Sequence, residues 1–427
     1  MASKHSALFS LLLVGLVHLL PAQVIITPGQ VATHPGVDPV RLQRIDKVIQ
    51  EFTESGKVVG AVALVVKDGK ILLHKGYGMD DRNTGKAMAP DAIFRIASQT
   101  KALTSAGILM LMEEGKLLLS DPVHKYIPTF KNLQVIDSFN ESDTSYTTVP
   151  AKRDITIRDL LTHTSGLGYP SIGSPMMKAV YAKHGISAGI GETGGNMAEA
   201  MLRLGTLPLE HQPGARWTYG INSDVLGHII EIISGMSLEE FFRKRICDPL
   251  GMADTWFNLP ASKKSRLSRI YLRQGPGAFT LLSKENAGVD PDFPLLPKSY
   301  FSGGAGLSST AMDYARFLQL FLNKGEYGGK RLLSPATVAM MLRNQSGNLY
   351  PEGHFGYGFS VVSEANPDDI RNIGSFAWGG AFGTRYWADP KANLIGIIMT
   401  QQYVPGPETG ELMDKFRNAV YQAAAKR

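Results

Sequence analysis

Strand-forming segments at both ends of the chain, with helical segments between them, constrain this fold most. Apolar residues recur at helical spacing from 38 to 52 and predict an amphipathic helix. The β-rich segments 59–66 and 71–77 follow it, separated by the turn signal Asp68-Gly69. A helix and a hairpin therefore begin the chain.

The C-terminal part returns to the same pattern. Four β-type segments and a last amphipathic helix are predicted there: 357–362, 373–378, 384–388, 394–400 and, for the helix, about 411–424. Helical patterns fill the region between the two ends. The simplest architecture is of the α/β (α+β) class: one antiparallel sheet built from both termini, flanked by the N- and C-terminal helices, with a helical region inserted.

The chain has 427 residues, enough for two or three structural units or one composite domain, and 44% of them are hydrophobic. We expect an α/β domain from 23–105 and 300–427 and a mostly helical domain from 106–299, with the active site between them. The Gly- and Ser-rich stretch 165–196 is predicted to be a long surface loop.

The N-terminus predicts export. Lys4 and His5 precede an apolar run over 7–20, and Ala22 offers a small residue for cleavage. The run is shorter than the roughly 20 residues that a permanent span needs. We expect a signal peptide over 1–22, a periplasmic or extracellular location, and no stable membrane insertion after cleavage; an uncleaved anchor is the alternative.

Composition excludes several function classes. The formal charge is +6, and no run of Lys or Arg is interleaved with aromatic residues, so no nucleic-acid partner is expected. Cys247 is the single cysteine, which rules out an internal disulfide and favours a buried thiol. No His-Glu cluster has zinc-ligand spacing, and we expect neither a metal nor an organic cofactor.

Ser98-Gln99-Thr100-Lys101 opens an apolar helix predicted over 98–114. Residues at i and i+3 share a helix face, so the Lys101 amine can reach the Ser98 hydroxyl. The helix N-terminus favours the negative charge of an attacking alkoxide. Lysine serves as a base only if its pKa falls from about 10.4 toward neutrality. A chain of this length contains roughly one such tetrapeptide by chance, so the motif needs support from elsewhere.

Two further segments supply that support. Tyr219 stands just before a predicted helix, where a phenol can relay protons. Near the C-terminus, Trp378-Gly379-Gly380-Ala381 lies between two predicted strands. Consecutive glycines in a strand indicate close approach of another group. That group could be a substrate carbonyl held by the N–H groups of Ser98 and Ala381, or the glycines could mark a bulge or tight packing.

The order of these motifs resembles the serine β-lactamase and penicillin-binding protein superfamily. Flanking segments match it in the same order: Phe94-Arg95-Ile96-Ala97, Leu160-Leu161-Thr162-His163-Thr164-Ser165-Gly166-Leu167, Gln212-Pro213-Gly214, Pro249-Leu250-Gly251-Met252 and Gly303-Gly304-Ala305-Gly306-Leu307. The resemblance implies a β-lactamase/transpeptidase-like fold, with Ser98 as nucleophile and Lys101 and Tyr219 handling protons.

Departures from the superfamily pattern concern the substrate. Ile221 occupies the asparagine place of Tyr-x-Asn, and Trp378-Gly379-Gly380 replaces Lys-Thr-Gly, whose lysine holds a substrate carboxylate. A neutral ester then fits better, because an unpaired carboxylate in the site is costly. The chain resembles the family VIII carboxylesterases, which implies that Trp378 and the glycines line the acyl pocket. Arg385 could restore a carboxylate anchor if it points inward, although we expect it on the surface.

The implied reaction is two-step acyl transfer through a Ser98 acyl-enzyme, acting on short-chain carboxylic esters, with weak β-lactamase side activity as an option. Three alternatives stay open: hydrolysis of β-lactams or D-amino-acid peptides, acyl transfer to an alcohol or amine, and a non-catalytic binding protein that kept the fold. We expect His163 to support the turn at Ser165-Gly166 rather than act as a base.

Overall fold

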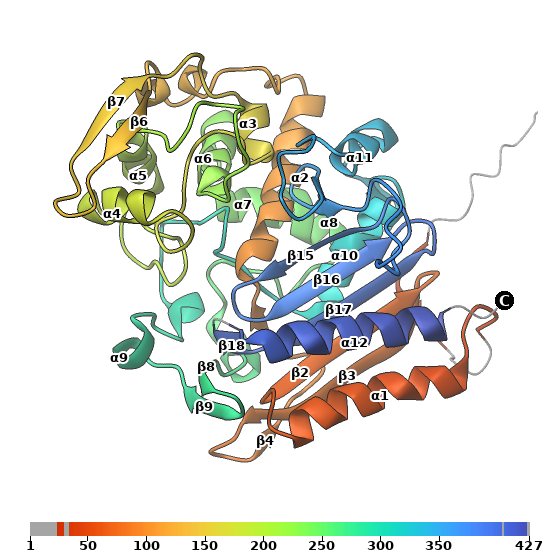
Figure 1. Cartoon of the computed structure of the whole chain (residues 1–427). Helices are drawn as coiled ribbons and strands as arrows, with labels where there is room; N and C mark the ends of the chain where they lie inside the picture. Colours follow the sequence, from red (N-terminus) through yellow and green to blue (C-terminus); the bar gives the residue numbers. More distant parts are fainter. Residues whose placement is uncertain (1–23, 30–33, 404, 425–427) are drawn as a thin grey trace, which may run out of the picture.

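The computed structural model describes residues 24–29, 34–403 and 405–424. Strands from both chain ends form one nine-stranded sheet, in the order β1-β3-β2-β17-β16-β15-β14-β13, with β4 paired to β3 (Figure 1). β2 (Gly60–Lys67) pairs antiparallel with β17 (Leu394–Thr400), which joins the N-terminal hairpin to the C-terminal strands. The remaining strands are β1 (Thr27–Pro28), β3 (Lys70–Asp81), β4 (Lys86–Ala87), β13 (His354–Phe355), β14 (Ser360–Val361), β15 (Phe376–Gly380) and β16 (Thr384–Asp389). The sheet predicted from both termini is confirmed; only the two-residue β1 pairs in parallel.

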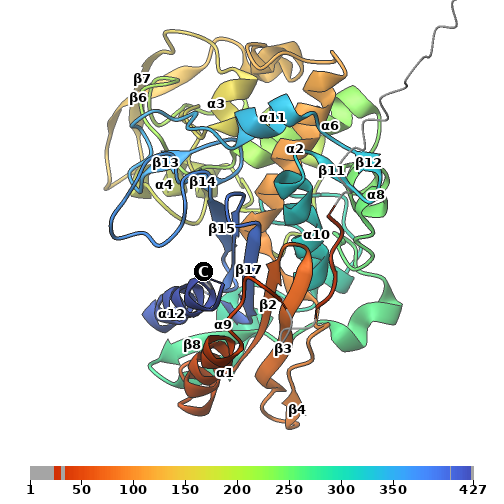
Figure 2. The same cartoon turned by 90° about the vertical axis from the view of Figure 1, so that its right-hand side faces the viewer.

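Helices cover both faces of this sheet (Figure 2). α1 (Pro39–Glu54) and α12 (Pro407–Ala423) pack together on one face, where they share an apolar core with alternate strand residues. α2 (Thr100–Glu113) and α10 (Ala311–Leu322) cover the other face. The two terminal helices were both predicted, because each has a single apolar stripe that must be buried.

The middle of the chain lies beside the second face. Its helices are α3 (Ile157–Leu161), α5 (Met197–Leu204), α6 (Asn222–Ser234), α7 (Leu238–Phe242), α8 (Asp248–Leu250) and α9 (Lys284–Ala287); α11 (Pro335–Met341) follows α10. Sequence patterns missed two hairpins here, β6 (Gln134–Phe139) with β7 (Tyr146–Pro150) and β8 (Tyr271–Gly275) with β9 (Ala278–Leu281). β18 (Gln402–Tyr403) pairs with β8. One apolar core runs from the sheet into α5 and α6, and the division into two domains stays a prediction.

The stretch 165–196 is not a continuous loop, so that prediction was wrong. It contains α4 (Pro175–Lys183), capped by Ser174, whose hydroxyl accepts a hydrogen bond from the Met177 N–H. Met177, Val180 and Tyr181 are buried at helical spacing. Proline at the first helical position and a serine cap are helix-start signals, which the Gly and Ser content of the stretch obscured.

Two predicted strands are shorter than expected. Only Ser360–Val361 of 357–362 forms a strand, because the Tyr357 N–H donates to the carbonyl of Met341, the last residue of α11. The strand predicted from Ile373 begins at Phe376, and Ile373 is 56% exposed in the preceding turn. In both cases tertiary contacts rather than local residue preference set the strand ends.

The helix α7 ends at Phe242 and continues as a π-helical turn over Arg243–Cys247. Cys247 is buried there, as expected, and burial raises the pKa of its thiol to about 12. The predicted signal peptide lies outside the described residues. Among the residues that are described, no helix is both long and apolar enough to cross a membrane.

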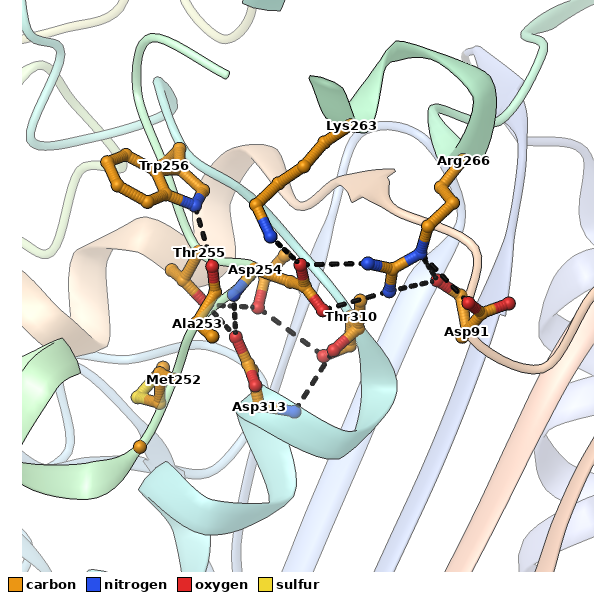
Figure 3. Close-up of polar contacts among 12 residues, drawn as sticks. Asp91, Met252, Ala253, Asp254, Thr255, Trp256, Lys263, Arg266, Thr310 and Asp313 are labelled. Carbon is orange, nitrogen blue, oxygen red and sulfur yellow. Dashed lines mark hydrogen bonds and ion pairs between the residues drawn. The ribbon is translucent and has the colours of Figure 1, made fainter. Parts of the chain in front are cut away.

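A polar network joins the segment that follows α8 to the start of α10 (Figure 3). Asp254 accepts hydrogen bonds from Lys263 Nζ at 2.6 Å and from Arg266 Nη2 at 2.8 Å. Thr310 caps α10, but Asp313 does not return the bond as the capping-box pattern predicts. Its carboxylate instead accepts from the Asp254 N–H at 2.7 Å, so one helix start serves as an anchor for a distant loop.

Replacing Asp254 should therefore destabilise the protein. Burial alone raises the pKa of Asp254, but the bonds from Arg266 and Lys263 outweigh it and hold the pKa below its ordinary value. We expect Asp254→Ala to lower the free energy of unfolding by about 2 kcal/mol, since it removes the ion-pair partner of Lys263 and leaves Arg266 paired with Asp91 alone. Glu240→Ala, which removes the exposed ion pair with Lys244, should cost less than about 0.5 kcal/mol. Equal urea midpoints for the two variants would contradict this account.

Candidate active site

Ser98 lies on a strained turn in front of α2. The turn is a 3-10 helix over Ala97–Gln99, and α2 begins at Thr100, so Ser98 precedes the helix predicted to start at it. Ala97 has a φ of 41°, a left-handed conformation that residues with a side chain avoid. Ala97 is fully buried in a cluster with Phe382, and this packing holds the strained backbone in place.

Lys101 lies in the first turn of α2 with its amine directed at Ser98. Lys101 Nζ is 3.2 Å from Ser98 Oγ and donates to the Gly304 carbonyl oxygen at 2.8 Å. Only 2% of Lys101 is exposed, although lysine is seldom buried without a partner. The spacing of the tetrapeptide placed the two side chains together as predicted.

Asp224 is a member of the site that sequence reasoning missed. Its carboxylate accepts from the Gly304 N–H at 2.8 Å and from Ser302 Oγ at 2.7 Å. The Gly304 residue thus donates to Asp224 through its N–H and accepts from Lys101 through its carbonyl. Burial raises the pKa of Asp224, and the positive charge of Lys101 opposes that rise. No local pattern could indicate this link, because it joins α6 to a loop 80 residues later.

Tyr219 completes the hydrogen bonds around the nucleophile. Its hydroxyl is 2.7 Å from Ser98 Oγ. Its ring stacks on Tyr169 with centroids 5.6 Å apart and lies 5.9 Å from the ring of Trp378. Lys101 Nζ lies 4.7 Å from the centre of the Tyr219 ring. Packing on several sides fixes the direction of the phenol, and Tyr169 is a second residue that the motifs did not identify.

His163 supports the segment that carries Tyr219. Its Nδ1 lies 2.9 Å from Asn222 Nδ2 and accepts from the Gly220 N–H at 3.3 Å. Burial, with a smaller contribution from the charge of Lys101, lowers the pKa of His163 to about 3. The imidazole is therefore neutral. Ser165 Oγ in turn bonds to Asn222, which links His163 to the turn at Ser165-Gly166 as expected.

The Trp378 strand borders the same cavity as the nucleophile. A cavity of about 710 Å³ is lined by Ser98, Tyr219 and the whole segment Trp378–Ala381. Among the described residues, neither the Ser98 N–H nor the Ala381 N–H has a hydrogen-bond acceptor. Two free N–H groups beside a serine hydroxyl have the composition of an oxyanion hole. The structure thus brings together every site residue predicted from the sequence, with Lys101 directly behind Ser98.

Protein groups, rather than a substrate carbonyl, account for both glycines. A Cβ added to Gly380 would overlap the Ile96 carbonyl oxygen and lie 3.0 Å from its carbon, because β15 packs against the backbone that leads to Ser98. A Cβ added to Gly379 would overlap Arg385 Nη1. Of the two interpretations that the sequence left open, tight packing is the one that the structure supports.

Arg385 does not lie on the open surface as expected. It faces Gly379 across the β15–β16 pair and lines the cavity with Ser98, and its side chain is half-buried. A strand arginine cannot be assigned to one face of a sheet before the strand register is known. The structure therefore corrects this expectation.

Gly380→Ala tests the close approach of β15 to the Ser98 turn. The added methyl group meets backbone atoms of Ile96, so the strand must shift away from Ser98. We expect a loss of about 10²-fold in kcat for ester turnover and a lower unfolding midpoint. Gly275→Ala is the control, since a Cβ there meets nothing within 4 Å. Unchanged kcat in Gly380→Ala would show that the contact is not needed.

His163 should make stability depend on pH. Its folded-state pKa of about 3 lies below the ordinary 6.5, so the unfolded state takes up the proton first as pH falls. This contribution to stability is present above pH 6.5 and declines by up to about 1.4 kcal/mol per pH unit below it. The unfolding free energy of His163→Gln should fall less steeply between pH 6 and 4 than that of the wild type. A wild-type slope in His163→Gln would refute the assignment.

Comparisons with known proteins identify the family and the fold. The Beta-lactamase family model matches residues 45–416. An uncharacterised protein of Mycobacterium tuberculosis is 34% identical over 371 residues, which are 83% of this chain and 88% of that one. Esterase EstB of Burkholderia gladioli is 31% identical over 88% of this chain and 94% of its own. The solved structure of EstCE1, "a hydrolase with promiscuous acyltransferase activity", has a TM-score of 0.77 at 26% identity and covers 90% of this chain and 99% of its own. The chain therefore belongs to the beta-lactamase family and is a hydrolase with the fold of the serine β-lactamase and penicillin-binding protein superfamily.

Proposed function

We propose that this protein is a serine carboxylesterase that hydrolyses short-chain carboxylic esters through an acyl-enzyme on Ser98. One observation carries the proposal: Ser98 Oγ lies 3.2 Å from Lys101 Nζ and 2.7 Å from the Tyr219 hydroxyl, at the wall of an open cavity. A serine hydroxyl becomes a nucleophile only when a base within hydrogen-bond reach takes its proton. Two such groups surround Ser98.

In the first step, Lys101 in its neutral form takes the proton of Ser98, and Oγ bonds to the ester carbonyl carbon. The oxygen of the resulting tetrahedral species accepts from the N–H groups of Ser98 and Ala381. As the carbon–oxygen bond to the alcohol breaks, Tyr219 donates its proton to the departing oxygen and regains one from Lys101. The products are the free alcohol and acyl-Ser98.

In the second step, water replaces the alcohol. It loses a proton to Tyr219 or Lys101, bonds to the acyl carbon, and releases the acid while Ser98 recovers its proton. The Asp224–Gly304–Lys101 contacts support this cycle, because they hold the amine in place whether or not it carries the proton. No described group of three His, Cys, Asp or Glu side chains could hold a metal ion.

The residue that replaces the lysine of the superfamily's Lys-Thr-Gly motif favours esters over β-lactams as substrates. Trp378 offers an apolar wall there, and its ring packs against Tyr219 and Phe355. The name of the relative Esterase EstB supports the same choice. Acyl transfer to an alcohol is the second candidate, favoured by the promiscuous acyltransferase activity of EstCE1. Hydrolysis and transfer share acyl-Ser98 and differ only in the acceptor.

A fluorophosphonate should label Ser98 and no other cavity serine. Ser360 lines the same cavity, but its hydroxyl donates to the Ala377 carbonyl and forms no hydrogen bond with a Lys, His or Tyr side chain in the described part of the chain. Mass spectrometry of the labelled protein should place the added mass on the Ser98 peptide and leave the Ser360 peptide unmodified. Ser98→Ala should lower kcat for p-nitrophenyl acetate by at least about 10³-fold. Full activity in Ser98→Ala would overturn the proposed nucleophile.

The same preparation separates the candidate substrates. We expect kcat/KM for p-nitrophenyl acetate to exceed that for a chromogenic cephalosporin, and a large excess in the other direction would make the protein a β-lactamase. Adding methanol or a primary amine and measuring the acylated product distinguishes transfer from hydrolysis.

A further inference from the structure

Arg385 reaches the active-site cavity from the opposite side of the sheet. It is two residues from Trp387, whose ring packs on Phe416 of α12, and alternate strand residues share a face. The side chain of Arg385 therefore leaves β16 on the α12 side. It then crosses Gly379, where a Cβ would lie 2.6 Å from Arg385 Cδ and overlap Nη1. The missing side chain of Gly379 is the gap through which the guanidinium reaches the cavity.

The guanidinium has almost no internal partner. No ion pair of Arg385 exists within the described part of the chain, and its one hydrogen bond there is a long one of 3.5 Å to the Thr384 carbonyl. Arg417 lines the same cavity but pairs with Asp414 at 2.8 Å. A guanidinium carries five N–H donors in a fork that matches a carboxylate. Most of the N–H donors of Arg385 are therefore available at this half-buried wall of the cavity.

The charged groups around Arg385 leave its N–H donors free to bind a ligand. Burial lowers the pKa of Arg385, and attraction from Tyr219 and Glu352 opposes that effect. Glu352 lines the cavity, yet it forms no ion pair with Arg385 and instead accepts from the Tyr350 hydroxyl at 2.9 Å. A buried cation of this kind gains most from an anion that brings two oxygens into the cavity.

The position of Arg385 along β15 indicates which half of an ester it would meet. The carbonyl is held at Ala381, and Gly379 lies two residues earlier, about 7 Å along the strand. Tyr219, which protonates the leaving alcohol, interacts electrostatically with Arg385 and packs on Trp378. The alcohol half of the substrate therefore lies on the Arg385 side, and the acyl half extends away from it. This arrangement places Trp378 and Gly379 beside the alcohol half, and not in the acyl pocket that the family resemblance implies.

We propose that Arg385 binds a carboxylate on the alcohol portion of the substrate, so that the preferred substrates are esters of hydroxycarboxylic acids. This inference rests on the proposed esterase function and specifies its substrate class. It also revises the expectation of a neutral ester. Trp378 stands where the superfamily has a carboxylate-binding lysine, and Arg385 on the neighbouring strand β16 supplies a cation in its place.

The test compares two esters that differ only in that charge, 4-acetoxybenzoate and its neutral amide, 4-acetoxybenzamide. Both give the same acetyl-Ser98, so differences in kcat/KM arise in the step that releases the alcohol half. Each value is divided by the rate of uncatalysed hydrolysis, which removes the difference in leaving-group reactivity. We expect the wild type to prefer the carboxylate by at least about 10-fold.

Two variants should abolish this preference. Arg385→Gln should lower kcat/KM for the carboxylate ester by about 10- to 100-fold and change that for the amide by less than about threefold. Gly379→Ala, which displaces the guanidinium while keeping its charge, should reduce the same ratio. Arg417→Gln is the matched control: it removes a paired cation from the same cavity and should leave the ratio unchanged.

The outcomes separate this inference from the function on which it rests. If the wild type hydrolyses the amide ester but shows no preference for the carboxylate, the Arg385 subsite is wrong and the esterase proposal stands. Equal losses on both esters in Arg385→Gln would make Arg385 a structural residue and overturn the inference. If neither ester is hydrolysed, the proposed function itself fails.

Discussion

The close approach of β15 to the turn before α2 is the constraint on which the rest of the site depends. Gly380 lies against the Ile96 carbonyl with no room for a side chain, and Ala97 adopts a left-handed conformation beside it. Through this contact the Ser98 N–H and the Ala381 N–H border one cavity, although they lie nearly 300 residues apart in the sequence. The antiparallel pairing of β2 with β17 makes the contact possible, because it brings the two chain ends into one sheet.

Around this contact, buried polar groups set the direction of each reactive side chain. Gly304 joins Asp224 to Lys101, and the neutral His163 holds the segment that carries Tyr219. A buried donor or acceptor without a partner is costly, so these bonds give each reactive group a single orientation. The reactive groups are thereby preorganised before a substrate arrives, and little reorganisation is needed during the reaction.

The cavity is also asymmetric in charge. On the face of β15 that contacts Tyr219, the cavity wall is the apolar side chain of Trp378. On the other face, the side chain of Arg385 extends across Gly379. The two neighbouring glycines thus have different roles: Gly380 brings β15 close to the nucleophile, and Gly379 admits a cation. A substrate would meet an apolar wall and a guanidinium at the same end of the cavity, which is a basis for discrimination among esters.

The sequence by itself determined the sheet built from both chain ends and the terminal helices, because these follow from the hydrophobic period. It also determined the Ser98–Lys101 contact, because the two residues share a helix face; Tyr219, 121 residues away, was joined to them by the order of the motifs. Only the tertiary structure decided where Asp224 and Arg385 lie and which groups His163 contacts as it supports the turn that the sequence assigned to it. Each acts through partners far away in sequence, and a strand side chain can be assigned to one face only when the register is known. The helix α4 and the early ends of two strands were missed for a related reason: caps and tertiary hydrogen bonds outweighed the composition of those stretches.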